Sequence, residues 1–251
     1  MKANIIHIEQ NFQFFLGKFN NNQKHKHYAI QLSIPLTGEI RFLIDDLEIS
    51  TNQAVLIKPN VEHILESEQE HLLILLNPAS SIGHFWNRLA HSPYSKLDTE
   101  PVTLIRELGL DYLSNKCSAK EFTQKIKAIL NSFDCHCESF VHSGDERIDK
   151  AIAYLKQHYE RVIPLEEVAA YCHLSPSRFL HLFKENTGIS YRRAQLWSKL
   201  MAALPLMSNQ SLTEIAHQVG FSDSAHFSRM FKENFGFSPS TILKLSQFIQ
   251  V

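Results

Sequence analysis

Three histidines in the first quarter of the chain have the residue type and spacing of a metal or effector site. His25 and His27 are separated by one residue, so both side chains point to the same side of an extended strand. His63 ends the segment Pro59–His63 and could approach the pair from a neighbouring strand. Three imidazoles in one pocket suit Zn, Fe or Mn. The same histidines could instead bond to loops or strand ends, so the sequence leaves metal binding open.

A second set of metal-ligand residue types lies at Cys135-His136-Cys137, with His142 close behind. Residues 134–145 show neither a helical nor a strand period, and we interpret this stretch as a solvated linker. The chain has four cysteines, which are too few for a disulfide scaffold and fit a reducing cytoplasm.

The sequence contains no recognisable catalytic centre. We find no phosphate-binding glycine loop, no G-x-S-x-G segment and no paired carboxylates at a plausible pocket. We therefore expect neither enzymatic activity nor a cofactor.

An internal repeat is the most specific feature of the chain. The segment 183–190, FKENTGIS, recurs at 231–238 as FKENFGFS, with six identities in eight residues. Upstream, Leu165, Val168 and Ala169 correspond to Leu212, Ile215 and Ala216. Two copies are too few to stack as a solenoid, so the repeat indicates two similar supersecondary units.

Each copy has the residues of a helix-turn-helix unit. A small residue, Ala169 or Ala216, occurs where the first helix must approach its partner closely. Gly220 can adopt the left-handed conformation that ends a helix, and His173 occupies that position in the first copy.

The second helix of each copy begins with a cap and has one apolar side. The caps are Ser175-Pro176 and Ser222-Asp223. The apolar sides consist of Phe179, Leu182 and Phe183 in the first copy, and Phe227, Met230 and Phe231 in the second. The outward residues are then Ser177, Arg178, Leu180, His181 and Lys184, and Ala225, His226, Ser228, Arg229 and Lys232.

An exposed helix start with Arg, His and short polar residues suits the major groove of DNA. Arg can bond the O6 and N7 atoms of guanine, and Ser and His can bond base edges or phosphate. Lysines at the far end of the helix and the capped helix start suit phosphate oxygens. The alternative is a helical bundle whose solvated faces have these polar residues, and the duplication favours DNA binding.

The elements that must position these residues change character along the chain. Up to residue 77 the apolar residues alternate, as in 27–34 and 40–49, with a tight turn expected at Asp45-Asp46. After Pro78 the period becomes helical, with amphipathic helices expected at 101–115 and along the apolar stripe of 122–133. We expect an α+β protein with a β-barrel and two helices at residues 1–133, a linker at 134–144, and an all-α domain at 145–251.

Composition and charge exclude several protein classes. The 251 residues are 44% hydrophobic and 20% charged, which argues against fibrous and largely disordered chains. No run of 18 apolar residues and no secretory signal are evident, so we expect no membrane partner. Residues 1–144 carry 13 basic and 16 acidic side chains, against 12 and 10 in the remainder. The net +2 of the C-terminal part is consistent with DNA binding and predicts several phosphate contacts rather than ten.

Residues 145–246 resemble the DNA-binding domain of the AraC/XylS family of bacterial transcription regulators. The carrying segments are LEEVAAYCHLSPSRFLHLFKENTGIS and LTEIAHQVGFSDSAHFSRMFKENFGFSP. The resemblance implies seven helices, with a recognition helix of each unit in successive segments of the major groove. Residues 190–207 would form the joining helix, ~27 Å long at ~1.5 Å per residue, and Pro205 is expected to end or kink it.

Carrying over the base-contact positions of the family gives Ser177, Leu180 and His181, then Ala225, His226, Ser228 and Arg229. Leu180 and Ala225 cannot bond bases, so they can at most contact a thymine methyl group. The resemblance further implies a cytoplasmic activator that binds promoter or operator DNA and RNA polymerase.

Family members with an N-terminal barrel resemble cupins and often bind an effector there. The candidate effector residues are His25, His27, Gln31, Arg41 and His63. Gln31 stands near the place of the carboxylate found in metal-binding cupins, so we favour a small organic effector over a metal. A metal-dependent cupin enzyme with an accessory helical domain is the alternative function.

The helices that follow the barrel are expected to form a homodimer through residues 101–133, as is common in such family members. Leu108 and Ile126 are the apolar positions chosen here to test that interface.

Overall fold

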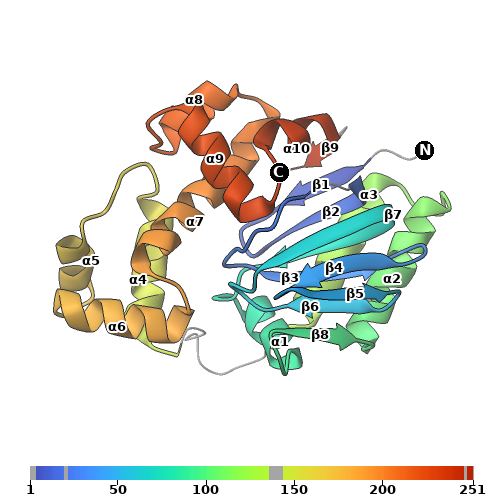
Figure 1. The fold of residues 1–251 in the computed structure, drawn as a ribbon, viewed down its shortest axis with the longest axis horizontal. Helices are drawn as coiled ribbons and strands as arrows, with labels where there is room; N and C mark the ends of the chain where they lie inside the picture. The colour runs from blue at the N-terminus through green and yellow to red at the C-terminus, as the bar shows by residue number, and fades with distance from the viewer. Residues whose placement is uncertain (1–3, 20–21, 136–143, 246–247, 251) are drawn as a thin grey trace. The chain divides into compact units, whose positions relative to one another are not determined.

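The computed structural model describes residues 4–19, 22–135, 144–245 and 248–250 (Figure 1). The chain forms two compact units, one of residues 1–137 with 233–251 and one of residues 138–232. Residues 233–251 cluster with the first unit. The functional division into domains stays a prediction.

The first unit is built on an antiparallel sheet. Its strands are β1 (Ile5–Ile8), β2 (Phe12–Phe19), β3 (Ile30–Pro35), β4 (Ile40–Ile44), β5 (Leu47–Thr51), β6 (Ala54–Ile57), β7 (His63–Leu76) and β8 (Tyr94–Leu97). A short ninth strand, β9 (Phe248–Gln250), pairs in parallel with β1. The order is β8-β6-β3-β7-β2-β1-β9, and β4 pairs with both β5 and β7.

The sheet is open and does not close into the expected β-barrel. The expected α+β class is confirmed. Among the described strands, β8 and β9 end the order and do not pair with each other. Alternating apolar residues show which side chains share a face, but they do not show which strands pair, and closure depends on pairing. The long strand β7 joins the two parts of the sheet, because it pairs with β2 and β3 at one end and with β4 at the other.

The predicted turn at Asp45-Asp46 is present. Ile44 pairs with Leu47, so two residues connect β4 to β5. Both aspartates have positive φ, 47° and 65°, as a two-residue hairpin of the type I′ class requires.

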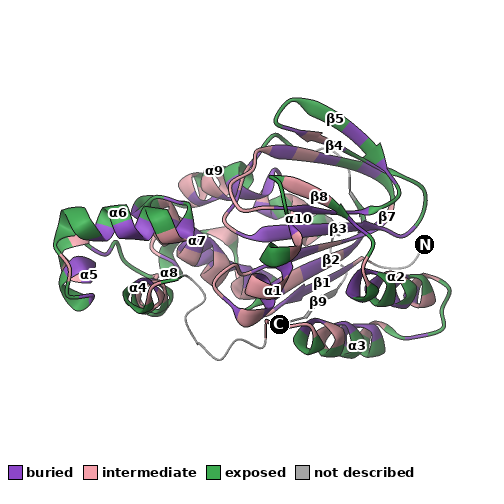
Figure 2. Ribbon diagram, turned by 90° about the horizontal axis from the view of Figure 1, so that it is seen from below, coloured by how far each residue is buried: buried purple, intermediate pink, exposed green. Residues whose placement is uncertain are grey.

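Each face of the sheet has its own apolar core. Phe12, Phe14, Ile30 and Leu32 belong to the larger core, which also contains buried residues of α1 (Ser81–Leu89), α2 (Glu100–Leu113) and α3 (Ala119–Ser132). The smaller core contains Ile40, Phe42, Ile44, Ile49, Val55, Ile57 and Leu65. Strand β3 is buried on both faces (Figure 2). The side chains of β3 that alternate with its larger-core residues therefore face the interior rather than solvent.

The two predicted helices after the strands are confirmed as α2 and α3. A capping box begins α3, in which Ser118 Oγ accepts from the N–H of Glu121 and Glu121 Oε2 accepts from the N–H of Ser118. Leu108 and Ile126 are buried in the core of the chain itself, so they are not free to contact a partner. A test of dimerisation must use the exposed residues of these helices.

The second unit and the adjoining end of the first are helical. The helices are α4 (Glu146–Gln157), α5 (Leu165–Tyr171), α6 (Pro176–Thr187), α7 (Tyr191–Ala203), α8 (Leu212–Gln218), α9 (Ser224–Phe235) and α10 (Pro239–Leu245). As expected from Pro205, α7 ends at Ala203 and continues as the 3-10 turn η1 (Leu204–Ser208). Its 13 residues span ~20 Å at ~1.5 Å per residue, less than the ~27 Å expected. In the part of the chain that the structure describes, no helix is long and apolar enough to cross a membrane.

Candidate nucleic-acid interface and histidine cluster

The first helix-turn-helix unit consists of α5 and α6. The turn passes through His173, whose φ of 55° is left-handed, as expected for the residue that ends α5. Ser175 caps α6 by accepting from the N–H of Arg178, and Pro176 occupies the first helical position. Phe179, Leu182 and Phe183 are buried on the inner side of α6, as predicted.

The outer side of α6 has the predicted DNA-facing residues, and all of them are exposed: Ser177, Arg178, Leu180, His181 and Lys184. His181 lies 3.6 Å from Glu185, one turn further along the helix. This contact leaves the side chain 69% exposed, so a duplex can reach it.

The second helix-turn-helix unit consists of α8 and α9 and repeats this construction with different caps. A capping box of Ser211 and Glu214 begins α8. Gly220 turns the chain with a φ of 74°, as predicted. Asp223 Oδ1 accepts from the N–H of His226 at 2.7 Å, which identifies the aspartate as the cap of α9. The N-terminus of a helix such as α9 is suited to a phosphate.

The outer side of α9 is less uniformly exposed than that of α6. Ala225, Arg229 and Lys232 are exposed, whereas His226 and Ser228 are half-buried. His226 Nδ1 lies 3.1 Å from Ser222 Oγ, a contact that orients the imidazole near the helix start. On the inner side, Phe227 and Phe231 are buried and Met230 is half-buried.

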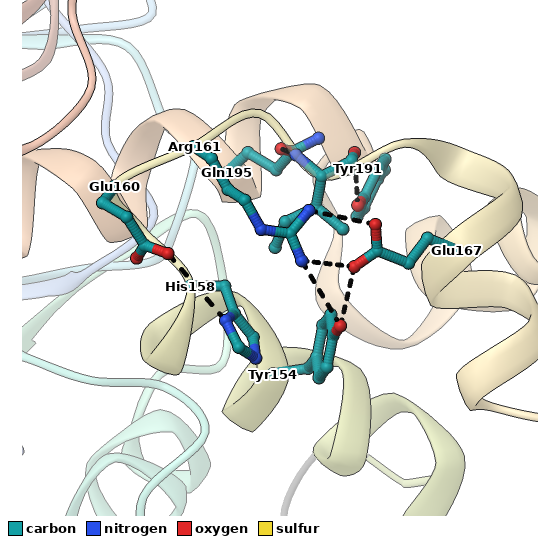
Figure 3. Close-up of polar contacts among 8 residues, drawn as sticks. Tyr154, His158, Glu160, Arg161, Glu167, Tyr191 and Gln195 are labelled. Atoms are coloured by element: carbon teal, nitrogen blue, oxygen red, sulfur yellow. Dashed lines mark hydrogen bonds and ion pairs between the residues drawn. The ribbon is translucent and has the colours of Figure 1, made fainter.

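A polar cluster that the sequence did not reveal holds the loop before α5 (Figure 3). Arg161 donates to both carboxylate oxygens of Glu167, at 3.0 and 2.5 Å, and Tyr154 donates to the same carboxylate at 2.6 Å. These donors, the guanidinium first, lower the pKa of Glu167 to about 2. The loop is also bonded to α7, because Tyr191 Oη donates to Ile163 O and Gln195 Oε1 accepts from Ile163 N.

The same helix α7 is hydrogen-bonded to the turn of the second helix-turn-helix unit. Lys199 is buried and donates from Nζ to Gly220 O at 2.7 Å, and its Nζ lies 5.8 Å from the centre of the Phe221 ring. Burial lowers the pKa of Lys199. Helix α7 therefore links the two helix-turn-helix units, through Tyr191 and Gln195 on one side and Lys199 on the other. The sequence signal for Lys199 was a charged residue between the apolar positions Trp197 and Leu200, whereas the Arg161–Glu167 pair left no periodic signal.

The first unit brings together four of the five predicted effector residues. His25, His27, Gln31 and His63 are all buried, and one ring nitrogen of each histidine lies within 4.8 Å of those of the other two. Gln31 Oε1 lies 3.1 Å from the Nε2 atoms of both His27 and His63. The fifth, Arg41, is 62% exposed and lies 4.0 Å from Glu66, so the structure does not bring it into this cluster.

Burial keeps the three imidazoles neutral near pH 7. Burial, followed by the proximity of His27, lowers the pKa of His25 to about 3. Burial also lowers the pKa of His27, and burial together with His25 and His27 lowers that of His63 well below its usual value. Of the other set of metal-ligand types, His136, Cys137 and His142 lie outside the described residues, and only Cys135 is described.

The helix-turn-helix part of the chain is similar to that of known transcription regulators. Residues 168–244 match the model of a helix-turn-helix domain. The transcriptional activator RhaS of Klebsiella pneumoniae is 37% identical over 102 residues, which are 40% of this chain and 37% of RhaS. The probable transcriptional regulator LumQ of Photobacterium leiognathi is 25% identical over 226 residues, 86% of this chain and 90% of LumQ. These matches confirm the resemblance to the AraC/XylS regulators for the helix-turn-helix part of the chain. Its match to RhaS spans little more than a third of that relative.

Solved structures share the fold of the chain over nearly its whole length. Apo ToxT from Vibrio cholerae has a TM-score of 0.63 at 15% identity, covering 96% of this chain and 100% of ToxT. ToxT bound to an unsaturated fatty acid has a TM-score of 0.62 at 13% identity and covers all of both chains. The order of elements, strands followed by helix-turn-helix units, is therefore shared with ToxT as a fold.

Proposed function

We propose that the protein is a transcription regulator that binds specific sites in double-stranded DNA through α6 and α9. The observation that carries the proposal is the doubled construction: each helix is capped, packs an aromatic side inward and has Arg and Lys on its outer side. We assign base contacts to Ser177, Leu180, His181, Ala225, His226, Ser228 and Arg229. We assign phosphate contacts to Lys184 and Lys232, with Arg178 able to serve in either way.

The linkage through α7 supports reading by both helices together. Helix α7 is hydrogen-bonded to the loop before the first helix-turn-helix unit and to the turn of the second. A fixed spacing between two recognition helices favours two half-sites on one face of a duplex.

The first compact unit, which contains the sheet, is proposed as the effector-binding part. ToxT, which shares the fold, has been solved with an unsaturated fatty acid. For this chain we infer a small-molecule effector in the first unit, with RNA polymerase as the partner at an activated promoter. Because the target is chromosomal DNA, we place the protein in the cytoplasm. The relatives reported above are named as regulators, which favours a non-enzymatic role over the metal-dependent enzyme.

A selection of bound fragments from the fragmented source genome tests the proposal. We expect enrichment of a common sequence, with affinity that falls as salt rises, because phosphate neutralisation releases counterions. The selection is run with and without a metabolite extract, so that a need for the effector is detected. If neither condition enriches any sequence while the protein remains folded, the proposal is wrong.

A further inference from the structure

The backbone around the histidine cluster is held by hydrogen bonds that bring the three rings together. His25 and His63 form an isolated antiparallel bridge, with N–H to O distances of 3.0 and 2.9 Å. The carbonyl of His27 accepts from the N–H of Asn60 at 2.8 Å. The ring centres of His25 and His63 are 4.3 Å apart, and His27 lies 5.6 and 5.3 Å from them.

The three imidazoles are all fixed in the same tautomer. Nδ1 of His25 lies 2.8 Å from Gln23 O, Nδ1 of His27 lies 3.0 Å from Ala29 O, and Nδ1 of His63 lies 3.0 Å from Val61 O. A carbonyl oxygen can only accept, so in each ring Nδ1 has the proton and donates it. In a neutral ring of this tautomer, Nε2 has a lone pair that can bind a metal. A hydrogen bond from Nδ1–H to a backbone carbonyl is also what orients histidine ligands in metal sites.

A side-chain oxygen, Gln31 Oε1, is a fourth candidate ligand beside the three histidines. Gln31 Oε1 lies 3.1 Å from Nε2 of His27 and from Nε2 of His63, so one side-chain oxygen lies beside two of the three rings. Gln31 Nε2 donates to Ser33 Oγ at 3.2 Å, so the amide also contacts the next inward residue of β3. Gln31 and Ser33 are buried, so the amide and the three imidazoles form one polar cluster inside the unit.

We propose that His25, His27 and His63, with the amide oxygen of Gln31, bind one divalent transition-metal ion in the first unit. The proposal needs only this geometry and does not rest on DNA binding. Three imidazoles and a carbonyl-type oxygen suit a borderline ion such as Zn²⁺ or Fe²⁺ rather than Mg²⁺ or Ca²⁺, which prefer sets of oxygen ligands.

The site requires a small inward movement of the rings. The nitrogens lie within 4.8 Å of one another, whereas tetrahedral Zn–N bonds place ligand nitrogens about 3.4 Å apart. The ligand set is also neutral, so the charge of the ion is balanced by none of its ligands. A carboxylate in place of the Gln31 amide is therefore expected to strengthen binding.

Titration of the full-length protein with Co²⁺ tests the site, after dialysis against a chelator. We expect one ion per chain with visible absorption bands of a coordinated ion, and displacement by Zn²⁺. The variant Gln31→Glu should tighten Co²⁺ binding by about tenfold or more, because it supplies a charged oxygen ligand. His63→Ala should weaken it by about 100-fold.

His71→Ala is the matched control, because it removes a buried histidine of β7 outside the cluster. This variant should keep stoichiometry and spectrum, and circular dichroism verifies that each variant is folded. Folded wild type without saturable 1:1 binding would overturn the proposal. So would Co²⁺ binding that neither Gln31→Glu nor His63→Ala changes; the cluster would then be a hydrogen-bonded network of imidazoles with a turned amide. Because no DNA is present, this failure would leave the proposed regulator function untouched.

Discussion

His71 shows how a single buried residue makes the stability of the first unit depend on pH. Its side chain is fully buried in β7, and burial lowers the pKa of the imidazole to about 4 from an ordinary value of 6.5. The folded protein therefore binds a proton at His71 less readily than the unfolded chain does. The resulting stability is complete above about pH 6.5, falls as the pH drops, and is lost by about pH 4.

We predict that His71→Gln flattens the pH dependence of unfolding between pH 6.5 and 4. A pKa difference of about 2.5 units corresponds to about 3 kcal/mol, the largest contribution that His71 can make. The free energy of unfolding, measured by urea denaturation at several pH values, is compared between wild type and variant. Equal slopes in the two proteins would show that His71 is not the titrating group.

At the scale of elements, the two turns of the helix-turn-helix units differ in one instructive way. His173 and Gly220 occupy equivalent places and both have positive φ, 55° and 74°. A side chain at position 220, however, would place its Cβ atom 2.1 Å from the backbone oxygen of Glu160. The close approach of two backbone segments therefore requires glycine at position 220. The left-handed conformation restricts the residue type less, because His173 adopts it as well.

We predict opposite effects for exchanging the residue types at these turns. Gly220→Asn should lower the free energy of unfolding by more than ~2 kcal/mol, because asparagine tolerates the left-handed conformation but not the clash. His173→Gly should change it by less than ~1 kcal/mol, in the stabilising direction. Chemical denaturation measures both. If conformation alone mattered, Gly220→Asn would be nearly as mild as His173→Gly.

Much of the element structure could be predicted from local patterns. The caps Ser175 and Asp223, the turn at Asp45-Asp46 and the end of α7 before Pro205 all follow from short-range rules. The open sheet could not be predicted, because strand pairing depends on contacts between residues far apart in the sequence.

The candidate sites divide in the same way. The exposed residues of α6 were predicted, because helical periodicity separates an outer from an inner side. The convergence of His63 with His25 and His27 could only be suggested, and the exposure of Arg41 was not foreseen. The bonds from Lys199 to Gly220 and from Arg161 to Glu167 join residues with no shared period, so they became visible only in three dimensions.

At the scale of the whole molecule, the proposed homodimer through residues 101–133 must use side chains left exposed by α2 and α3. Leu104 is 38% exposed and Leu110 is 40% exposed, whereas Leu108 and Ile126 belong to the core of the chain. Exposed leucines on helices that follow the strands are candidates for burial against a second copy.

We predict that the double variant Leu104→Glu/Leu110→Glu converts a dimer into a monomer, because charges would be buried at the interface. Light scattering over a range of concentrations measures the mass. Val162→Glu is the matched control, since Val162 is 73% exposed in the second unit and should not affect association. A dimer that survives the double variant would exclude this surface.

We expect α9 to distinguish DNA sequences through Arg229 and to hold phosphate through Lys232. Both side chains are exposed on α9, and Arg88 of α1 is an exposed arginine outside the helix-turn-helix units that serves as the control. The decisive measurement is the affinity of wild type, Arg229→Ala, Lys232→Ala and Arg88→Ala for the selected site and for a random duplex, at several salt concentrations.

Arg229→Ala should lose ~1–3 kcal/mol on the selected site, roughly 5- to 150-fold, and much less on random DNA. Lys232→Ala should weaken binding to both duplexes alike and reduce the salt slope by about one, and Arg88→Ala should change neither. Equal losses on both duplexes for Arg229→Ala, or none, would contradict base recognition by α9.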